Sequence, residues 1–197
     1  MDITLTLTGT TPLLQHNVRL VDPLDPRTKE LAAATATYKK TKTEADQLEA
    51  RRVEWYGGIY YDDTIGVYVP GSWVLKSLAD GGVVYGRKGK AVKAALIMKE
   101  PMITLLHDGP SDLDELWADP KYRDERAIGV QSNKIIRTRP RFPKWAIETE
   151  AYLDASMLDF EILQVIADKA GTLVGIGDYR PAKGGPFGRY EATIEQV

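Results

Sequence analysis

The chain has 197 residues, of which 43% are hydrophobic and 27% charged, a composition typical of a folded globular protein. It has no cysteine, which excludes disulfides and thiolate metal sites, and only two histidines, so a histidine-rich metal site is not expected. The sequence lacks the pattern of a signal peptide and any apolar run of about 18 residues that could span a membrane, so we expect a cytoplasmic protein with no membrane partner.

The charges are unevenly distributed, although the formal net charge is only −2. Five basic residues and no acid lie between Arg87 and Lys99, whereas seven acids and two bases lie between Asp108 and Glu125. A protein that is acidic overall can still present a basic groove. Solvated charged faces are the alternative reading of these segments.

The first part of the chain predicts a strand followed by a helical segment. Ile3, Leu5 and Leu7 alternate with threonines, which is the period-2 pattern of a half-buried strand. Residues 26–56 are rich in alanine, lysine and glutamate, which predicts one helix or two. Because the apolar stripe of this segment is thin, we expect an insertion that packs over a sheet edge or reaches toward a partner.

Strands and helices alternate through the rest of the chain. The segments predicted in order are strands in 57–70, a helix capped by Ser72 and ended by Gly81, strands or a helix–strand pair in 91–107, an acidic loop with a short helix in 108–126, two strands in 133–154, a helix capped by Ser156 in 156–171, and a closing strand in 189–197. This order predicts an α+β protein with a ferredoxin-like or RRM-like core and a helical insertion after the first strand. We expect one domain spanning 1–197, with insertions at about 26–56 and 108–126.

A glycine-rich basic loop precedes the closing strand. Five glycines lie between Gly175 and Gly188, together with Arg180 and Lys183, and Arg189 follows directly. Glycines allow backbone N–H groups to turn toward an anion and allow a nucleic-acid strand to approach closely. The alternative is a flexible hairpin turn.

Two further segments have the residue types that bind phosphates and bases. Pro70-Gly71-Ser72 places Ser72 at a helix N-terminus, an anion-binding position that Lys76 could reach, although a simple helix cap is equally compatible. In "RTRPRFPKW", alternation puts Arg137, Arg139 and Arg141 on one strand face for phosphates, while Phe142 and Trp145 could stack on bases; a solvated hairpin is the alternative.

A third segment, "YGRKGKAVK", reads as a flexible basic tongue or as a charged loop that maintains solubility. The candidate nucleic-acid-binding residues are therefore Ser72, Lys76, Arg87, Lys88, Lys90, Lys93, Arg137, Arg139, Arg141, Phe142, Trp145, Arg180, Lys183 and Arg189.

Three motifs in chain order resemble the RAMP superfamily, the RNA-binding backbone proteins of CRISPR effector complexes. They are Thr11-Pro12-Leu13 after the first strand, Tyr68-Val69-Pro70-Gly71-Ser72 with Leu75-Lys76 at the helix, and Gly185-Pro186-Phe187-Gly188-Arg189-Tyr190 near the C-terminus. The chain also looks similar to stand-alone members carried by bacteriophages. The resemblance implies a protein that binds a nucleic-acid strand and assembles side by side along it.

The leading hypothesis is a sequence-tolerant single-stranded nucleic-acid-binding protein, with DNA preferred over RNA, that oligomerises along the strand during phage DNA replication or recombination. The second is an interaction or assembly protein, or a CRISPR-backbone mimic, that docks through 26–56. The third is a metal-dependent ribonuclease that uses Asp22 or Asp25, for which helix capping and turn formation are the alternative reading. We expect no enzymatic activity and no cofactor. Asp62-Asp63 could hold a divalent ion, but an aspartate pair of this kind is typical of a turn, so we expect no metal site either.

Overall fold

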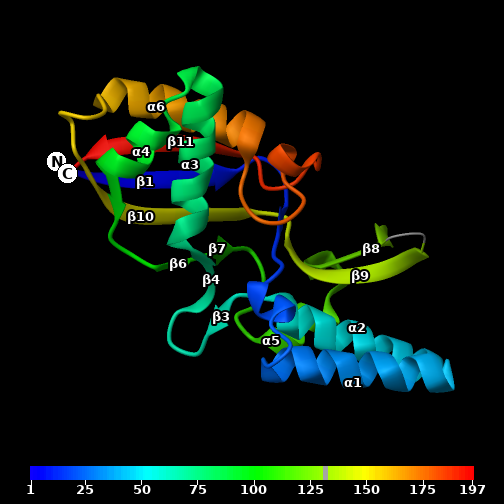
Figure 1. Ribbon diagram of the computed structural model, residues 1–197. Helices are drawn as coiled ribbons and strands as arrows, with labels where there is room; N and C mark the ends of the chain where they lie inside the picture. Colours follow the sequence, from blue (N-terminus) through cyan, green and yellow to red (C-terminus); the bar gives the residue numbers. More distant parts are fainter. Residues whose placement is uncertain (131–132) are drawn as a thin grey trace. The chain divides into compact units, whose positions relative to one another are not determined.

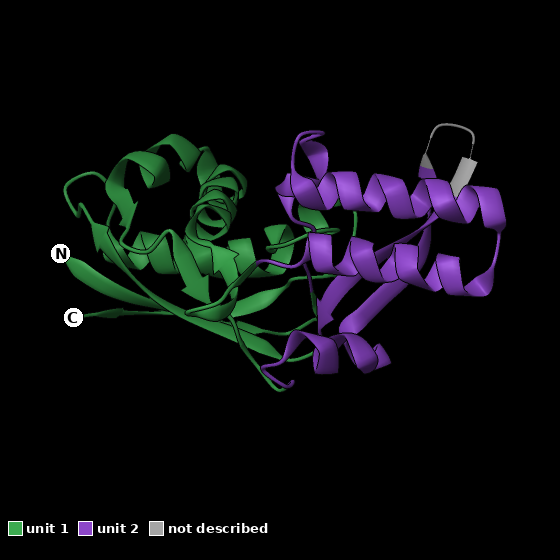
Figure 2. Cartoon of the chain, turned by 90° about the horizontal axis from the view of Figure 1, so that it is seen from below, with its two compact units in different colours: residues 1–13, 61–108, 143–197 green, residues 14–60, 109–142 purple. Residues whose placement is uncertain are grey.

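The computed structural model describes residues 1–130 and 133–197, and the side chains of residues 1–129 and 135–197. The chain forms two compact units, each built from separate stretches of sequence (Figure 2). Unit 1 comprises Met1–Leu13, Tyr61–Asp108 and Pro143–Val197, and unit 2 comprises Leu14–Tyr60 and Gly109–Phe142. The segments expected as insertions, 26–56 and 108–126, belong to unit 2 apart from Asp108. The single-domain organisation stays a prediction.

Unit 1 is built on an antiparallel sheet with the strand order β11-β1-β10-β5, and the short strand β7 also pairs with β10. The strands are β1 (Asp2–Gly9), β5 (Leu96–Met98), β7 (Leu106–His107), β10 (Trp145–Leu153) and β11 (Tyr190–Gln196). The first and last segments of the chain thus pair side by side, as Leu5 opposite Ile194 illustrates.

Three helices cover one face of this sheet, α3 (Gly71–Gly86), α4 (Gly89–Ala95) and α6 (Phe160–Lys169) (Figure 1). The strand alternation predicts this arrangement, because the apolar residues of β1 point to one face. Ile3, Leu5 and Leu7 are fully buried, whereas the threonines between them are not. Leu163 and Ile166 of α6 are also fully buried, as an amphipathic helix on a sheet requires.

Smaller elements complete unit 1. A second sheet pairs β3 (Tyr61–Asp62) and β6 (Met102–Thr104) with β4 (Gly66–Pro70), which leads directly into α3. The chain then continues α6 as a π-helical turn, Ala170–Val174, and includes a 3-10 turn at Pro181–Lys183 before β11.

Unit 2 combines helices with a three-stranded sheet of order β2-β9-β8. Its elements are β2 (Leu13–Leu14), a 3-10 turn at Val18–Val21, α1 (Pro26–Thr41), α2 (Glu44–Gly58), α5 (Leu113–Ala118), a 3-10 turn at Pro120–Tyr122, β8 (Arg123–Val130) and β9 (Asn133–Phe142). The first residue of β2, Leu13, is also the last residue of the Met1–Leu13 stretch of unit 1. Trp55, Leu116, Tyr122 and Phe142 are fully or almost fully buried and form its core.

The helical segment expected at 26–56 is two helices. They are separated at Lys42, whose φ is 56°, and the Thr43 side chain caps α2 by accepting a hydrogen bond from the Asp46 N–H. No residue of α1 is buried, so this helix packs only lightly on the rest of unit 2.

The structure confirms an α+β protein with antiparallel sheets, and it corrects three predicted helix ends. Pro70 is the N-cap of α3 in place of Ser72, and Asp159 is the N-cap of α6 in place of Ser156. Helix α3 also continues past Gly81 to Gly86, because Gly81 is a packing position against the Ala170 side chain and not a helix stop. Within the described residues, no helix is both long and apolar enough to cross a membrane.

Candidate nucleic-acid interface

A pocket of about 190 Å³ lies in unit 1 between helix α3 and the glycine-rich loop. Its described lining residues are Trp73, Lys76, Ser77, Gly175, Ile176, Gly177 and Arg180. We call this the Lys76–Arg180 pocket. Two of the segments singled out in the sequence, the helix after Pro70 and the loop from Gly175, therefore meet at one place.

Helix geometry explains why α3 contributes three residues to the pocket. Trp73, Lys76 and Ser77 are three and four positions apart, so their side chains lie on the same helix face. Ser77 is buried, and its hydroxyl donates to the Gly175 carbonyl at 3.0 Å and lies 2.9 Å from the Tyr190 hydroxyl. Ser77 thus links α3 to the glycine-rich loop and to β11. Burial raises the pKa of Tyr190, which keeps its hydroxyl protonated for this contact.

The glycine-rich loop is a tightly bonded structure, so the flexible-hairpin reading is wrong. The N–H groups of Ile176, Gly185 and Gly188 donate to the carbonyls of Gly188 at 2.9 Å, Arg180 at 3.1 Å and Pro12 at 2.8 Å, respectively. Four of the loop glycines have a positive φ, and they allow these turns. Because these three amides are bonded inside the protein, they are not available to a phosphate, and the side chains that line the pocket are the better candidates for contacts with an anion.

The loop is joined to the first of the three motifs as well. The Arg189 N–H donates to the Thr11 hydroxyl at 2.9 Å, and the Thr10 N–H donates to the Arg189 carbonyl at 2.9 Å. The Arg189 guanidinium donates to the Thr172 carbonyl and therefore has a structural role at the base of the loop. The three motif segments, far apart in sequence, are thus held together in unit 1.

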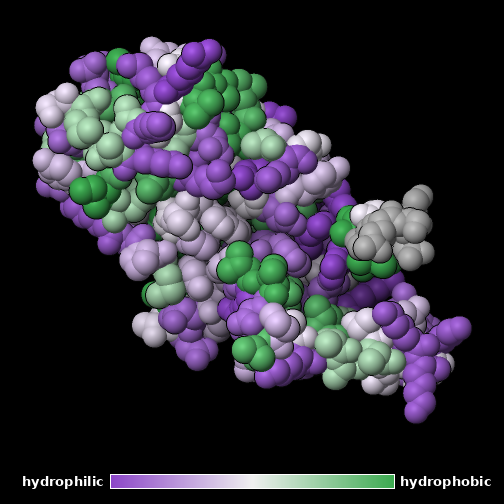
Figure 3. Space-filling view, in the orientation of Figure 1, coloured by the Kyte–Doolittle hydropathy of each residue, from purple (hydrophilic) through white to green (hydrophobic). Residues whose placement is uncertain are grey.

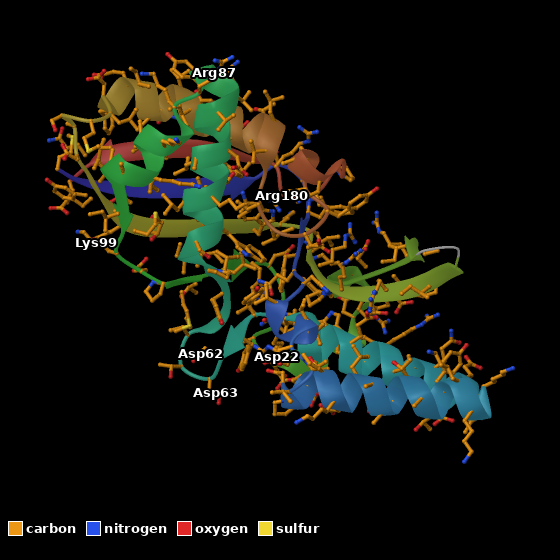
Figure 4. The ribbon with its side chains drawn as sticks, in the orientation of Figure 1. Asp22, Asp62, Asp63, Arg87, Lys99 and Arg180 are labelled. Atoms are coloured by element: carbon orange, nitrogen blue, oxygen red, sulfur yellow. The ribbon has the colours of Figure 1, made fainter. Side chains whose placement is uncertain are left out.

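Two cations line the pocket, one from α3 and one from the glycine-rich loop. The Lys76 ammonium belongs to α3 and lies 3.0 Å from the Asp80 carboxylate one turn later. The Arg180 guanidinium donates to the Gly177 carbonyl at 3.2 Å, and Figure 4 shows it on the loop beside the middle of α3. Lys183 is exposed at the end of the 3-10 turn of the same loop. Ser72 is exposed at the start of α3 and is not among the described lining residues.

Four of the predicted cations lie elsewhere on unit 1. Arg87, Lys88, Lys90 and Lys93 surround the turn from α3 to α4, and we call them the basic corner. Arg87 follows Lys76 by eleven residues, which places it about 16 Å further along the helix axis. Figure 4 shows Arg87 at the far end of α3 from the start of the helix. The basic corner is therefore a second surface and not part of the pocket.

The arginines of β9 belong to unit 2 and are engaged in contacts inside it. Arg137 donates to the Glu54 carboxylate at 2.7 Å, and Arg141 donates to the Lys121 carbonyl at 3.3 Å. Arg139 is nine-tenths buried, with its guanidinium 3.9 Å from the Asp124 carboxylate. The expectation of a shared phosphate-binding face is wrong for Arg139, because its side chain is not accessible to a nucleic acid.

The two aromatic residues next to these arginines do not offer a stacking surface. Phe142 is 0% exposed and packs beside Tyr122, whereas Trp145 is 4% exposed and donates its indole N–H to the Thr11 carbonyl at 2.8 Å. Both rings are core residues of their units, so the prediction that they stack on bases is wrong. Trp73 and Tyr179 are aromatic residues at or beside the pocket that remain partly exposed, and the sequence analysis missed them. Trp73 could have been found from its position three residues before Lys76.

The uncovered face of the main sheet carries acids instead of bases. We call it the outer sheet face. Its members, opposite one another in the strand register, include Asp2, Thr4, Thr6, Thr8, Glu148, Glu150, Tyr152, Glu191, Thr193 and Glu195. Carboxylates repel phosphates, so this face does not suit binding of a strand across the sheet. The basic pocket beside α3 and the loop is the better candidate in unit 1.

The aspartates considered for catalysis have structural partners. The Asp22 carboxylate accepts from the Leu24 N–H at 2.9 Å, and the Asp25 carboxylate accepts from the Arg27 N–H at 2.8 Å as the N-cap of α1. Asp62 accepts from the Thr64 N–H at 2.9 Å in a turn. These contacts confirm the capping and turn readings; Figure 4 labels Asp22, Asp62 and Asp63. In residues 1–130 and 133–197, no group of three acidic, histidine or cysteine side chains could hold a metal ion.

Comparison with known proteins adds no family to this description. No protein-family model matches the chain, and no curated protein matches it.

Proposed function

We propose that the protein binds single-stranded nucleic acid at the Lys76–Arg180 pocket and oligomerises along the strand. The observation that carries the proposal is the convergence of Lys76 and Arg180, from elements about 100 residues apart, on one pocket beside a partly exposed tryptophan. Two cations and an aromatic ring are the groups that recognise a phosphate and a base without regard to sequence. The resemblance to phage proteins favours DNA over RNA and a role in phage DNA replication or recombination.

We also propose that unit 1 has a ferredoxin-like core of the RAMP kind. The strand order supports it, since β11-β1-β10-β5 places the fourth, first, third and second strands of this sheet path side by side, with α3 and α6 as the two crossover helices. Hydrogen bonds join the first motif to the third, and the Ser77 hydroxyl, directly after the second motif, lies 2.9 Å from the Tyr190 hydroxyl of the third. These contacts support the proposal further, because a shared site would need all three segments.

In the proposed complex, the phosphate contacts come from side chains. Lys76 contributes a point charge, while Arg180 contributes a planar fork held by the Gly177 carbonyl. One base stacks on Trp73, whose indole forms part of the pocket. Binding of this kind is tolerant of sequence and weakens steeply as the salt concentration rises.

Fluorescence anisotropy with labelled 30-nucleotide DNA, the equivalent RNA and a duplex tests this function. We expect saturable binding of the single strands at low salt, tighter for DNA, and weaker binding of the duplex. Failure to bind either single strand at low salt would refute the proposal, and tighter binding of RNA would refute the preference for DNA.

A second candidate function is docking on another protein through α1 and α2. It is favoured by the absence of buried residues in α1 and by a groove of about 500 Å³ between α1, α2 and β9, lined by Leu31, Tyr38 and Ile136 among others. If docking is the function, replacing Leu31 and Tyr38 with aspartate should abolish the protein's function in the cell, because the partner protein no longer docks, while single-strand binding stays unchanged.

A further inference from the structure

Unit 1 has two exposed surfaces of opposite charge, each with apolar residues at its centre. The first is the basic corner at the end of α3. Val83, Val84 and Tyr85 are 58%, 51% and 39% exposed there. They directly precede the four cations Arg87, Lys88, Lys90 and Lys93, and Figure 3 shows hydrophobic side chains gathered over this end of α3.

The second surface is the outer sheet face. Ile97 of β5 lies opposite Tyr152 of β10, and the two side chains are 60% and 45% exposed. The carboxylates of Glu148, Glu150, Glu191 and Glu195 extend from this pair across the sheet. Lys99 offsets part of the charge, since its ammonium lies 2.9 Å from both Asp2 and Glu150. The face remains strongly acidic.

These two surfaces fit each other in charge and in apolar content. Exposed apolar residues rimmed by charged ones are typical of protein interaction sites. Opposite charges on the two partners orient the encounter and disfavour wrong pairings. The helices α3, α4 and α6 cover one face of the sheet (Figure 1). The register and burial pattern of β10 and β11 place the glutamates on the other face, so one molecule cannot bring its own two surfaces together.

We propose that the basic corner of one copy docks on the outer sheet face of a second copy. The contact is heterologous, because different surfaces of the two molecules meet, and repetition of such a contact produces an open chain unless the rotation closes a ring. This inference rests on the self-association in the proposed function and names the surfaces that perform it. It assigns Arg87, Lys88, Lys90 and Lys93 to a protein contact, and it leaves the Lys76–Arg180 pocket of each copy available for the strand.

Charge reversal on each surface tests the contact by sedimentation velocity in the absence of nucleic acid. One variant carries Lys90→Glu and Lys93→Glu, and the other carries Glu191→Lys and Glu195→Lys. The self-association affinity of each variant should be lower than that of the wild type by about tenfold or more, because attraction between the two surfaces is replaced by repulsion. An equimolar mixture should recover association, since the reversed corner of one variant meets the reversed sheet face of the other.

The matched control is Glu161→Lys with Asp168→Lys, which reverses two exposed acids on α6 and should leave association unchanged. A monomeric wild type, an unaffected reversal variant or a mixture that does not recover would each overturn the inference. A 10-nucleotide oligonucleotide separates this result from the proposed function. The Glu191→Lys, Glu195→Lys variant should bind this oligonucleotide at least as tightly as the wild type. If the wild type itself does not bind it, the result contradicts strand binding at the Lys76–Arg180 pocket and not the contact between copies.

Discussion

The Lys76 ammonium lies 3.0 Å from the Asp80 carboxylate, one helical turn further along α3, and the same lysine lines the pocket beside Arg180. The Asp80 carboxylate forms an ion pair with the ammonium group that a phosphate would otherwise contact. Asp80 therefore competes with the proposed ligand for the Lys76 ammonium and lowers its affinity.

Replacing Asp80 with asparagine should strengthen single-strand binding roughly two- to fivefold, the range expected when an exposed ion pair is removed. The matched control is Asp168→Asn on α6, which removes the same charge from an exposed position of unit 1. Anisotropy titrations at one salt concentration measure both. Equal effects of the two substitutions would mean that only net charge matters and that Lys76 does not contact the strand.

Two glycines of α3 should respond in opposite ways to alanine. A Cβ at Gly81 would lie 2.7 Å from the Ala170 Cβ and 2.8 Å from the Ile166 carbonyl oxygen, so Gly81→Ala should lower the free energy of unfolding by about 1–3 kcal/mol. Gly86 has open space around it, so Gly86→Ala should raise the free energy of unfolding by up to about 1 kcal/mol. Urea unfolding measures the difference, and a stabilising Gly81→Ala would contradict the packing of α3 on the α6 segment.

Glu54 should be a stability residue of unit 2. Its buried carboxylate accepts from Arg137 at 2.7 Å and from the Thr138 N–H at 2.9 Å. Glu54→Ala should cost about 2–3 kcal/mol, because two charge-assisted hydrogen bonds are lost. The exposed Arg27–Glu30 pair provides the control, and Glu30→Ala should cost at most about 0.5 kcal/mol. Thermal and urea unfolding measure both costs. Equal costs for Glu54→Ala and Glu30→Ala would contradict the role of the Glu54–Arg137 pair in the stability of unit 2.

His107 should make unit 1 less stable in mild acid. Burial lowers the pKa of this half-buried imidazole, with a smaller opposing effect from Asp108. The unfolded chain therefore binds a proton more readily than the folded one, so the stability that depends on neutral His107 is present above the unfolded pKa of about 6.5 and is lost as the pH falls through the lower folded pKa. Unfolding at pH 7.5 and pH 5.0 should show a smaller loss for His107→Gln than for the wild type. An equal loss would exclude this role.

The regular elements could be predicted from sequence because their patterns are local. The alternation of Leu5 and Leu7 with threonines predicts both β1 and its buried face, and the same reasoning applied to β10 and β11 would have placed their glutamates on the outer sheet face. The break between α1 and α2 also has a local signal in Thr43.

The composition of the site depends on contacts between distant segments, which no local pattern contains. The Ser77 hydroxyl meets the Gly175 carbonyl 98 residues away. The sequence shows that Arg139 and Phe142 lie on opposite faces of a strand, but both are buried because unit 2 covers both faces at that end, with Asp124 of β8 facing the arginine. Alternation identifies faces, and only the tertiary structure shows which faces meet solvent.

The salt dependence of oligonucleotide binding tests the central claim most directly. The slope of log affinity against log salt is measured for the wild type, for Lys76→Met with Arg180→Met, and for a control with Lys29→Met and Lys39→Met on α1. Each neutralised phosphate contributes about 0.7 on single strands, so removal of two contacts should reduce the slope by about 1.4. The claim predicts that reduction in the pocket variant together with an unchanged slope in the control, whereas a pocket variant with the wild-type slope and affinity would contradict it.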